Sequence, residues 1–209
     1  MLLNLLPVLV SAAALAQPAA AWFPQPTFET DFLAAQGLWR LAQDQSTNAS
    51  GGCTVAKAAV RREWTTLLPK ERKAYTDAVR CLQNKPALSD PVAVPGAKSR
   101  YDDFVAVHIN NTFTIHATAN FLTWHRLFTW TYEKALREEC GYAGYQPYWN
   151  WAKTAIDPIN SPMFDGSAYS MGGNGVFAPH NCTNALPNNL NCIPPGVGGG
   201  CVETGPFKK

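Results

Sequence analysis

The stretch HATANFLTWHRLFTWTYE, residues 116–133, governs the fold of this chain, because it joins two histidines to the start of a long amphipathic segment. His116 opens the stretch, His125 follows within it, and His108 lies just before it, so three of the chain's four histidines fall close together. Histidine is the commonest metal ligand among side chains, and neutral imidazole suits copper, zinc and iron. The concentration of histidines therefore predicts a metal site.

Spacing along a helix restricts how these three imidazoles can meet. A continuous helix rises about 1.5 Å per residue, so His108 and His116 would stand about 12 Å apart along its axis. Ligand nitrogens lie about 2 Å from a metal ion, so one helix cannot supply all three. Residues 110–112, Asn-Asn-Thr, are poor helix formers and are expected to end the first helix. We predict His108 on that helix, His125 near the start of an antiparallel one, and His116 between them.

The remaining sequence predicts a mainly α-helical fold. Residues 27–43 are expected to form one helix, and residues 69–85 a second. Pro69 suits the first turn of the second helix, and Pro86 ends it. Four of its side chains recur at helical spacing and are expected to face a core: Tyr75, Ala78, Val79 and Leu82.

Two further helices are expected to carry the histidines. Residues 101–108 have a helical apolar face, although a short strand is an alternative because the apolar run is brief. Residues 121–139 favour a longer helix, with Asn120 as the candidate N-cap. Glu133 and Arg137 are spaced for an ion pair on its surface.

Beyond Trp151 the sequence changes character. Residues 152–209 are rich in Gly, Pro, Asn and Cys and show little periodicity, which predicts an irregular segment tied by disulfides. The chain has six cysteines and no CxxC pair, so three disulfides are expected instead of a cysteine zinc site. Their pairing stays open among these residues: Cys53, Cys81, Cys140, Cys182, Cys192 and Cys201.

Composition and the first residues favour an exported globular protein. The 209 residues are 46% hydrophobic, which fits one domain, and a net charge of +2 without a basic run argues against a nucleic-acid partner. Residues 1–20 are expected to be a signal peptide, although no basic residue precedes the apolar run, which is too short to span a bilayer. Three sequons fit secretion: Asn48, Asn110 and Asn181.

The residues around the histidines resemble a known signature. His116 is followed by Phe121, Leu122, Trp124, His125, Arg126 and Glu133, which is similar to the first copper-site signature of tyrosinases and their catechol-oxidase and haemocyanin relatives. The later PYWNW, residues 147–151, resembles the motif that follows this signature. RREW at residues 61–64 is most like secreted fungal members. The resemblance covers roughly residues 50–205.

This resemblance implies a cofactor, a fold and an activity. Members of the family hold two coppers in an antiparallel bundle of four helices, with three histidines for each copper, and oxidise phenols or catechols to quinones with dioxygen. It assigns His108, His116 and His125 to one copper, and a portion of that bundle to this chain. The implied partners are a small phenolic substrate and dioxygen.

The chain departs from the family pattern in its histidine count. Two coppers need six histidines, whereas the chain has four and contains no HxxxH. His180 stands beside a cysteine and a sequon and is expected to be structural or exposed. Residues 21–209 are therefore expected to be the N-terminal part of a tyrosinase copper-binding domain, truncated before the second site. Such a half-site is expected to be inactive alone and to expose an apolar face through which it could associate.

Two other functions stay open, and one chemical detail is expected to be absent. The chain is alternatively a non-catalytic, secreted copper-binding half-domain, or a mononuclear zinc hydrolase with three histidines and an open position. The zinc alternative lacks an HExxH motif and a clearly placed base. Some relatives link a cysteine to the middle histidine, but Thr114 stands two residues before His116, so no thioether is expected.

Overall fold

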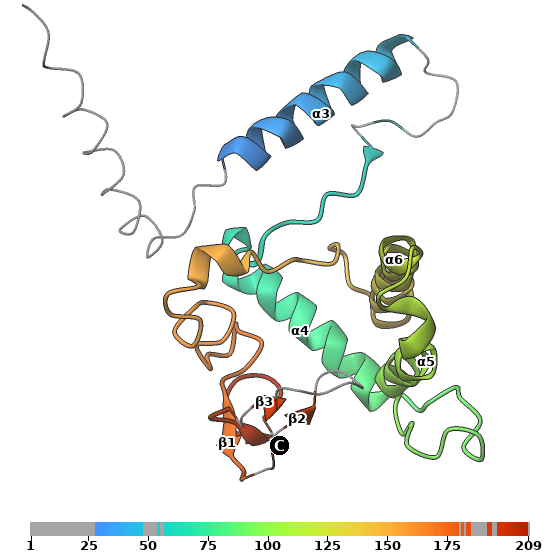
Figure 1. Ribbon diagram of the computed structural model, residues 1–209, viewed down its shortest axis with the longest axis vertical. Coiled ribbons are helices and arrows are strands. Elements are labelled where there is room, and N and C mark those ends of the chain that lie inside the picture. Colours follow the sequence, from blue (N-terminus) through green and yellow to red (C-terminus); the bar gives the residue numbers. More distant parts are fainter. Residues whose placement is uncertain are drawn as a thin grey trace, which may run out of the picture. The chain divides into compact units, whose positions relative to one another are not determined.

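The computed structural model describes residues 28–47, 54, 57–179, 181, 183–184, 192–193 and 196–208. The chain divides into two compact units, Met1–Val60 with Asn150–Asp157, and Arg61–Trp149 with Pro158–Lys209. The first unit contains helix α3 (Phe28–Thr47) and the short 3-10 helix η3 (Trp151–Thr154). The second contains η2 (Trp64–Thr66), α4 (Pro69–Asn84), α5 (Arg100–Ile115), α6 (Phe121–Cys140) and four short strands. The predicted mainly α fold is confirmed (Figure 1).

Helix α4 forms the centre of the core in the second unit. It begins at Pro69, as predicted, and the Leu68 backbone N–H donates to the Glu71 carboxylate at 2.7 Å, which satisfies a group that the helix itself leaves open. The predicted apolar face is buried, and it packs with residues from η2, α6 and the later loops. The core cluster consists of Trp64, Leu67, Tyr75, Ala78, Val79, Leu82, Ala135, Leu136, Tyr142 and Met163.

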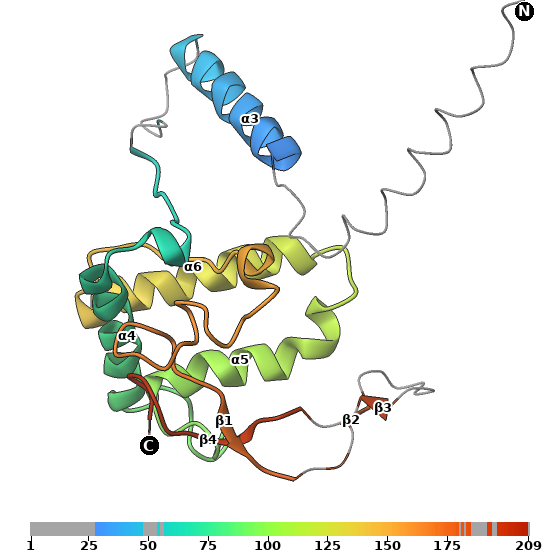
Figure 2. The ribbon, with the colours of Figure 1, turned by 90° about the vertical axis from the view of Figure 1, so that its left-hand side faces the viewer.

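Helices α5 and α6 form an antiparallel pair, which Figure 2 shows side by side. The contacts along the two helices show that they run in opposite directions. Arg100 at the start of α5 pairs with Glu139 near the end of α6, at 3.2 Å. Further along α5, His108 meets His125 near the start of α6, with 3.3 Å between their Nε2 atoms. The helical alternative for residues 101–108 is therefore the correct one.

Helix α5 is longer than the sequence predicted. It continues through residues 110–112 and ends at Ile115, so the expected break at Asn-Asn-Thr is wrong. The polar side chains there bond within the helix: Asn111 donates to the Val107 carbonyl at 2.8 Å, and Thr112 donates to the His108 carbonyl at 2.9 Å. These bonds to the preceding turn remove the competition that usually makes such residues leave a helix.

The start of α6 differs from the prediction in a smaller way. Asn120 does occupy the N-cap position, but its side chain makes no capping hydrogen bond. Its Oδ1 atom accepts the hydroxyl of Thr118 instead. The helix ends at Cys140, where Gly141 adopts the left-handed conformation, with φ of 67°, that favours glycine after a helix.

The predicted surface pair of Glu133 and Arg137 is wrong. Glu133 is buried, and its carboxylate accepts from Arg61 Nε at 3.1 Å and from the Gln146 backbone N–H at 2.7 Å. Arg137 instead donates to the Gly144 carbonyl at 2.8 Å. A buried carboxylate requires nearby donors that satisfy it, and residues distant in the sequence supply them here.

The connection between α4 and α5 is held by a buried carboxylate. Asp103 accepts from the backbone N–H groups of Leu88 at 2.9 Å and Ser89 at 3.0 Å, and from the Ser89 hydroxyl at 2.6 Å. Arg100 adds an ion pair at 3.2 Å. Burial alone would raise the pKa of Asp103, but the hydrogen bonds from Ser89, Leu88 and Arg100 outweigh it and lower the pKa below its usual value.

Replacing Asp103 with asparagine is expected to reduce the free energy of unfolding by about 2–3 kcal/mol at pH 7, because the amide places donors against donors. The pKa of Asp103 is lower in the folded state than in the unfolded state, where it is about 3.9. The ionised carboxylate therefore stabilises the fold fully above pH values of about 3.9. This stabilisation is lost as pH falls through the folded-state pKa. Denaturation series from pH 7 to pH 2 should show the difference between the two proteins shrinking at the acid end.

The matched control for that experiment is Asp77→Asn. Asp77 is an exposed aspartate paired with Lys73 on α4, so its replacement is expected to change stability by less than about 1 kcal/mol. Equal effects of the two substitutions, or a difference that does not change with pH, would contradict the anchoring role of Asp103.

The C-terminal part is irregular, as predicted, with two small antiparallel sheets. Strand β1 (Gly175–Phe177) pairs with β4 (Gly199–Val202), and β2 (Thr183–Asn184) pairs with β3 (Cys192–Ile193). Cys201 in β4 is exposed and unbonded, so the expectation that all six cysteines pair is wrong at this position.

The disulfide found among the described residues joins helices α4 and α6 and lies outside the C-terminal segment. Cys81 in α4 bonds to Cys140 at the end of α6, with 5.9 Å between their Cα atoms. Of the other predicted features, Cys53, Cys182, His180, Asn48 and residues 1–20 lie outside the described residues. Within the part of the chain that the structure describes, no helix combines the length and apolar character needed to cross a membrane.

Candidate metal centre

Two antiparallel helices and the turn between them bring the histidines together, although the chain turns after Ile115 and not at residues 110–112 as predicted. His108 lies in the second half of α5, His116 is the residue that caps its C-terminus, and His125 lies in the second turn of α6. Ala117, with φ of 54°, is part of the turn that reverses the chain between the helices. One ligand atom from each histidine lies within 4.8 Å of the other two. The three residues are named below as the three-histidine site.

Backbone carbonyls orient two of the imidazoles. His116 Nδ1 lies 2.8 Å from the Thr112 carbonyl oxygen, and His125 Nδ1 lies 2.8 Å from the Phe121 carbonyl oxygen. A carbonyl oxygen only accepts, so each Nδ1 carries the proton and donates it. In the neutral imidazole this leaves Nε2 of His116 and of His125 as the nitrogen with the lone pair, the atom with which a histidine binds a metal in this orientation.

The spacing of the ring nitrogens fits a shared metal ion. His108 Nε2 and His125 Nε2 are 3.3 Å apart. Two nitrogens that are each about 2 Å from one ion, at trigonal or tetrahedral angles, are separated by about 3.3–3.5 Å. All-imidazole ligation suits copper as well as zinc. The residues present can thus hold a copper ion, and His116 closes the set from the turn.

Aromatic rings surround the three-histidine site. The Phe121 ring centroid lies 4.4 Å from that of His125, and the Trp124 centroid lies 5.0 Å from it. Phe128 approaches His108 at 5.8 Å. The three histidines are partly buried rather than exposed. These rings supply apolar contacts to the imidazoles of both α5 and α6.

The contacts of these aromatic residues with the histidines could be predicted from the sequence only in part. Phe121 precedes His125 by four residues, so helical periodicity predicts their contact, whereas Trp124 is adjacent to His125 in the sequence and periodicity does not predict its ring contact. Phe128 could be predicted, because it lies near His125 along one stripe of α6. The contacts with His108 come from the pairing of two helices, which the pattern within one helix does not reveal.

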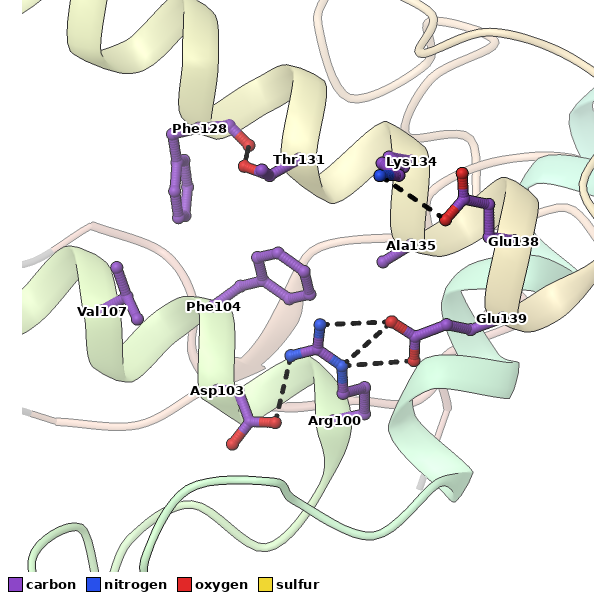
Figure 3. A pocket seen from close by; sticks show the side chains of 10 residues that line it. All are labelled: Arg100, Asp103, Phe104, Val107, Phe128, Thr131, Lys134, Ala135, Glu138 and Glu139. Carbon is purple, nitrogen blue, oxygen red and sulfur yellow. Dashed lines mark hydrogen bonds and ion pairs between the residues drawn. The ribbon is translucent and has the colours of Figure 1, made fainter.

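Two hollows lie along the α5–α6 pair. One, of about 370 Å³, opens beside His108 and is lined by aromatic and apolar side chains, among them Tyr75, Tyr101, Tyr132 and Met171. The other, of about 430 Å³, is a groove between the helices into which Phe104 and Phe128 project (Figure 3). Arg100 closes one end of this groove through ion pairs with Asp103 and Glu139.

Both helices also present large apolar side chains to solvent. The exposed members on α5 and α6 are Val105, Val107, Ile109, Phe113, Phe121, Leu122, Leu127 and Trp130. A contiguous apolar surface commonly marks an interaction site. Association through an exposed apolar face stays a prediction.

Comparisons with known proteins agree with the geometry. The model of the common central domain of tyrosinase matches residues 98–209. Tyrosinase-like protein orsC from Emericella nidulans is 50% identical over 166 residues, which cover 75% of this chain and 45% of the relative. Tyrosinase P from Aspergillus terreus is 45% identical over 172 residues, covering 78% of this chain and 47% of that protein.

A solved structure extends the agreement to three dimensions. A polyphenol oxidase from Thermothelomyces thermophila is 50% identical to this chain and superposes with a TM-score of 0.73, covering 81% of this chain and 45% of that one. The chain spans about half the length of the curated relatives it matches. By the match of the family model and by these identities, the chain belongs to the tyrosinase family.

Proposed function

We propose that this chain supplies the first copper site of a tyrosinase-type oxidoreductase, with His108, His116 and His125 as the ligands. The observation that carries the proposal is the convergence of three imidazoles whose ligand atoms lie within 4.8 Å of one another. The proposed substrates are small phenols or catechols, oxidised to quinones with dioxygen. A relative named N-acetyl-6-hydroxytryptophan oxidase, 45% identical over 162 residues, supports a hydroxylated aromatic substrate.

The protein groups have distinct tasks in this proposal. A bound copper would supply the electron transfer and oxygen chemistry that side chains perform poorly. The carbonyls of Thr112 and Phe121 hold His116 and His125 in the tautomer that presents Nε2. The aromatic rings pack against the imidazoles, and the apolar hollow beside His108 offers walls suited to an aromatic ring.

The histidine count limits what the 209 residues do alone. Four histidines cannot complete two sites of three, so we propose that residues 21–209 hold one copper and that a second copper site must come from outside this sequence for turnover. The chain is proposed to be secreted and glycosylated, because residues 1–20 resemble a signal peptide and three sequons follow.

Metal analysis and an oxygen-consumption assay test this function together. The purified chain, loaded with cuprous copper under anaerobic conditions, is expected to retain one copper per chain and to show no catechol-dependent oxygen uptake. Two coppers per chain with robust uptake would refute the half-site. Zinc retained in preference to copper would refute the oxidoreductase assignment. Both the half-site and the non-catalytic alternative predict one copper and no uptake, so the state of association separates them. The half-site is expected to associate or aggregate through an exposed apolar face, whereas a monodisperse monomer with one tightly bound copper would favour the non-catalytic copper-binding alternative.

A further inference from the structure

We propose that a line of aromatic side chains carries oxidising equivalents away from the three-histidine site, with Trp124 as the first electron donor and Tyr132 as the second. The function is protective: an oxidant formed at the metal would otherwise attack the ligand histidines. This inference rests on the proposed copper site, and it concerns residues that binding of the metal does not itself require.

The line starts in direct contact with the site. The Trp124 ring centroid lies 5.0 Å from that of His125 and 6.0 Å from that of His108. Its indole also stacks on Phe128, with 4.9 Å between centroids and 17° between planes. Indole is among the most easily oxidised side chains, and among the described residues Trp124 is the tryptophan or tyrosine in ring contact with these histidines.

Two phenylalanine rings then continue the line to a phenol. Phe128 lies 6.1 Å from Phe104 across the groove between α5 and α6, where Figure 3 shows both rings. Phe104 lies 5.3 Å from Tyr132. The phenylalanines are hard to oxidise and act only as packed material between the two donors. Trp124 and Tyr132 are eight residues apart on one helix, about 12 Å along its axis, a distance that electrons cross by tunnelling.

The surroundings of Tyr132 favour a neutral radical. Burial raises the pKa of Tyr132, and its hydroxyl lies beside that of Tyr75, so the phenol stays protonated until it is oxidised. Gln146 in turn donates to the Tyr75 hydroxyl at 2.8 Å. Loss of an electron from Tyr132 therefore releases its proton into a hydrogen-bonded neighbourhood. Tyr101, partly exposed and 6.2 Å from Tyr132, gives the line an end that a reductant can reach.

The electrons balance with hydrogen peroxide as the oxidant. Peroxide takes up two electrons and two protons to give two water molecules. A bound cuprous ion would supply one of these electrons, and Trp124 would give the other together with its Nε1 proton; solvent would supply the second proton. An electron from Tyr132 and a proton from solvent restore the indole, and Tyr132 loses its phenolic proton. A hydrogen atom from an external thiol, delivered by way of Tyr101, returns Tyr132 to the phenol.

The experiment treats the full chain, loaded with cuprous copper, with one equivalent of hydrogen peroxide. Freeze-quench electron paramagnetic resonance is expected to show a tyrosyl radical in the wild type. Trp124→Phe is expected to lose that signal and to increase oxidation of His108, His116 and His125 several-fold, as measured by peptide mass spectrometry. Tyr132→Phe is expected to leave a tryptophan radical in its place.

Two further variants separate electron transfer from packing. Trp130 lies on the same helix, is exposed and contacts Lys134, so Trp130→Phe should behave as the wild type. Trp124→Tyr keeps an oxidisable ring and should restore the radical and the protection. Equal histidine oxidation in Trp124→Phe and Trp130→Phe would overturn the relay while leaving the copper site intact. Failure of the wild type to retain copper, measured beforehand, would overturn the proposed function and the relay with it.

Discussion

Replacing His125 with alanine is expected to lower the affinity of the chain for cuprous copper by more than about a hundredfold, because even the partners that orient such ligands contribute tenfold to a hundredfold. His125 faces both other histidines, with ring centroids 5.4 Å from His108 and 5.0 Å from His116. Two imidazoles without the third leave copper with an open, solvated position. Competition with a chromogenic cuprous chelator under anaerobic conditions measures the loss.

The fourth histidine provides the matched control. His180 is predicted to be structural or exposed, so His180→Ala should keep the wild-type copper affinity. Circular dichroism should confirm that both variants keep their helices. An unchanged affinity in His125→Ala, or a similar loss in His180→Ala, would show that the three-histidine site is not where copper binds.

Removing the Cys81–Cys140 disulfide is expected to lower the free energy of unfolding by about 4 kcal/mol, on the chain-entropy model for its sequence separation of 59 residues. The bond joins the last turn of α4 to the end of α6. It therefore closes a loop that contains all of α5 and the three-histidine site. Thermal and denaturant unfolding of Cys81→Ser with Cys140→Ser measure the change.

Cys201, which is exposed and unbonded, provides the control for the disulfide variant. Cys201→Ser is expected to unfold like the wild type, because its thiol forms no bond and lies at the surface. Reduction of the wild type should reproduce the double variant and should leave that variant itself unchanged. If reduction destabilises both proteins equally, the stabilising bond lies elsewhere in the chain.

The buried face of α4 and the antiparallel pairing of α5 with α6 could be predicted, because patterns within short stretches of sequence carry that information. The stripe of α4 residues from Tyr75 to Leu82 follows helical spacing, and the same residues are buried. The rise of a helix keeps the three histidines from meeting on one helix, and the structure places His108 on α5 and His125 on the antiparallel α6. Both inferences depend on helical rise and periodicity, which are properties of the backbone and vary little between proteins.

Other features could not be predicted because distant residues decide them. Glu133 pairs with Arg61, which lies 72 residues away in the sequence, and helical spacing suggested Arg137. Asp103 accepts hydrogen bonds from Leu88 and Ser89 of the preceding loop, and no sequence pattern predicts these bonds. A buried carboxylate takes whichever donors the folded chain brings to it, so its partners are known only after the fold is known.

By itself, the sequence determined the family, the helical class and the three residues that must meet if a metal binds. Spacing and residue type carry that information, since one helix cannot gather His108, His116 and His125. The tertiary structure decided which nitrogens face one another and which aromatic rings approach them. The reason is physical: tautomers follow from carbonyls that the helices position, and ring contacts follow from the pairing of α5 with α6, at distances that no local pattern sets.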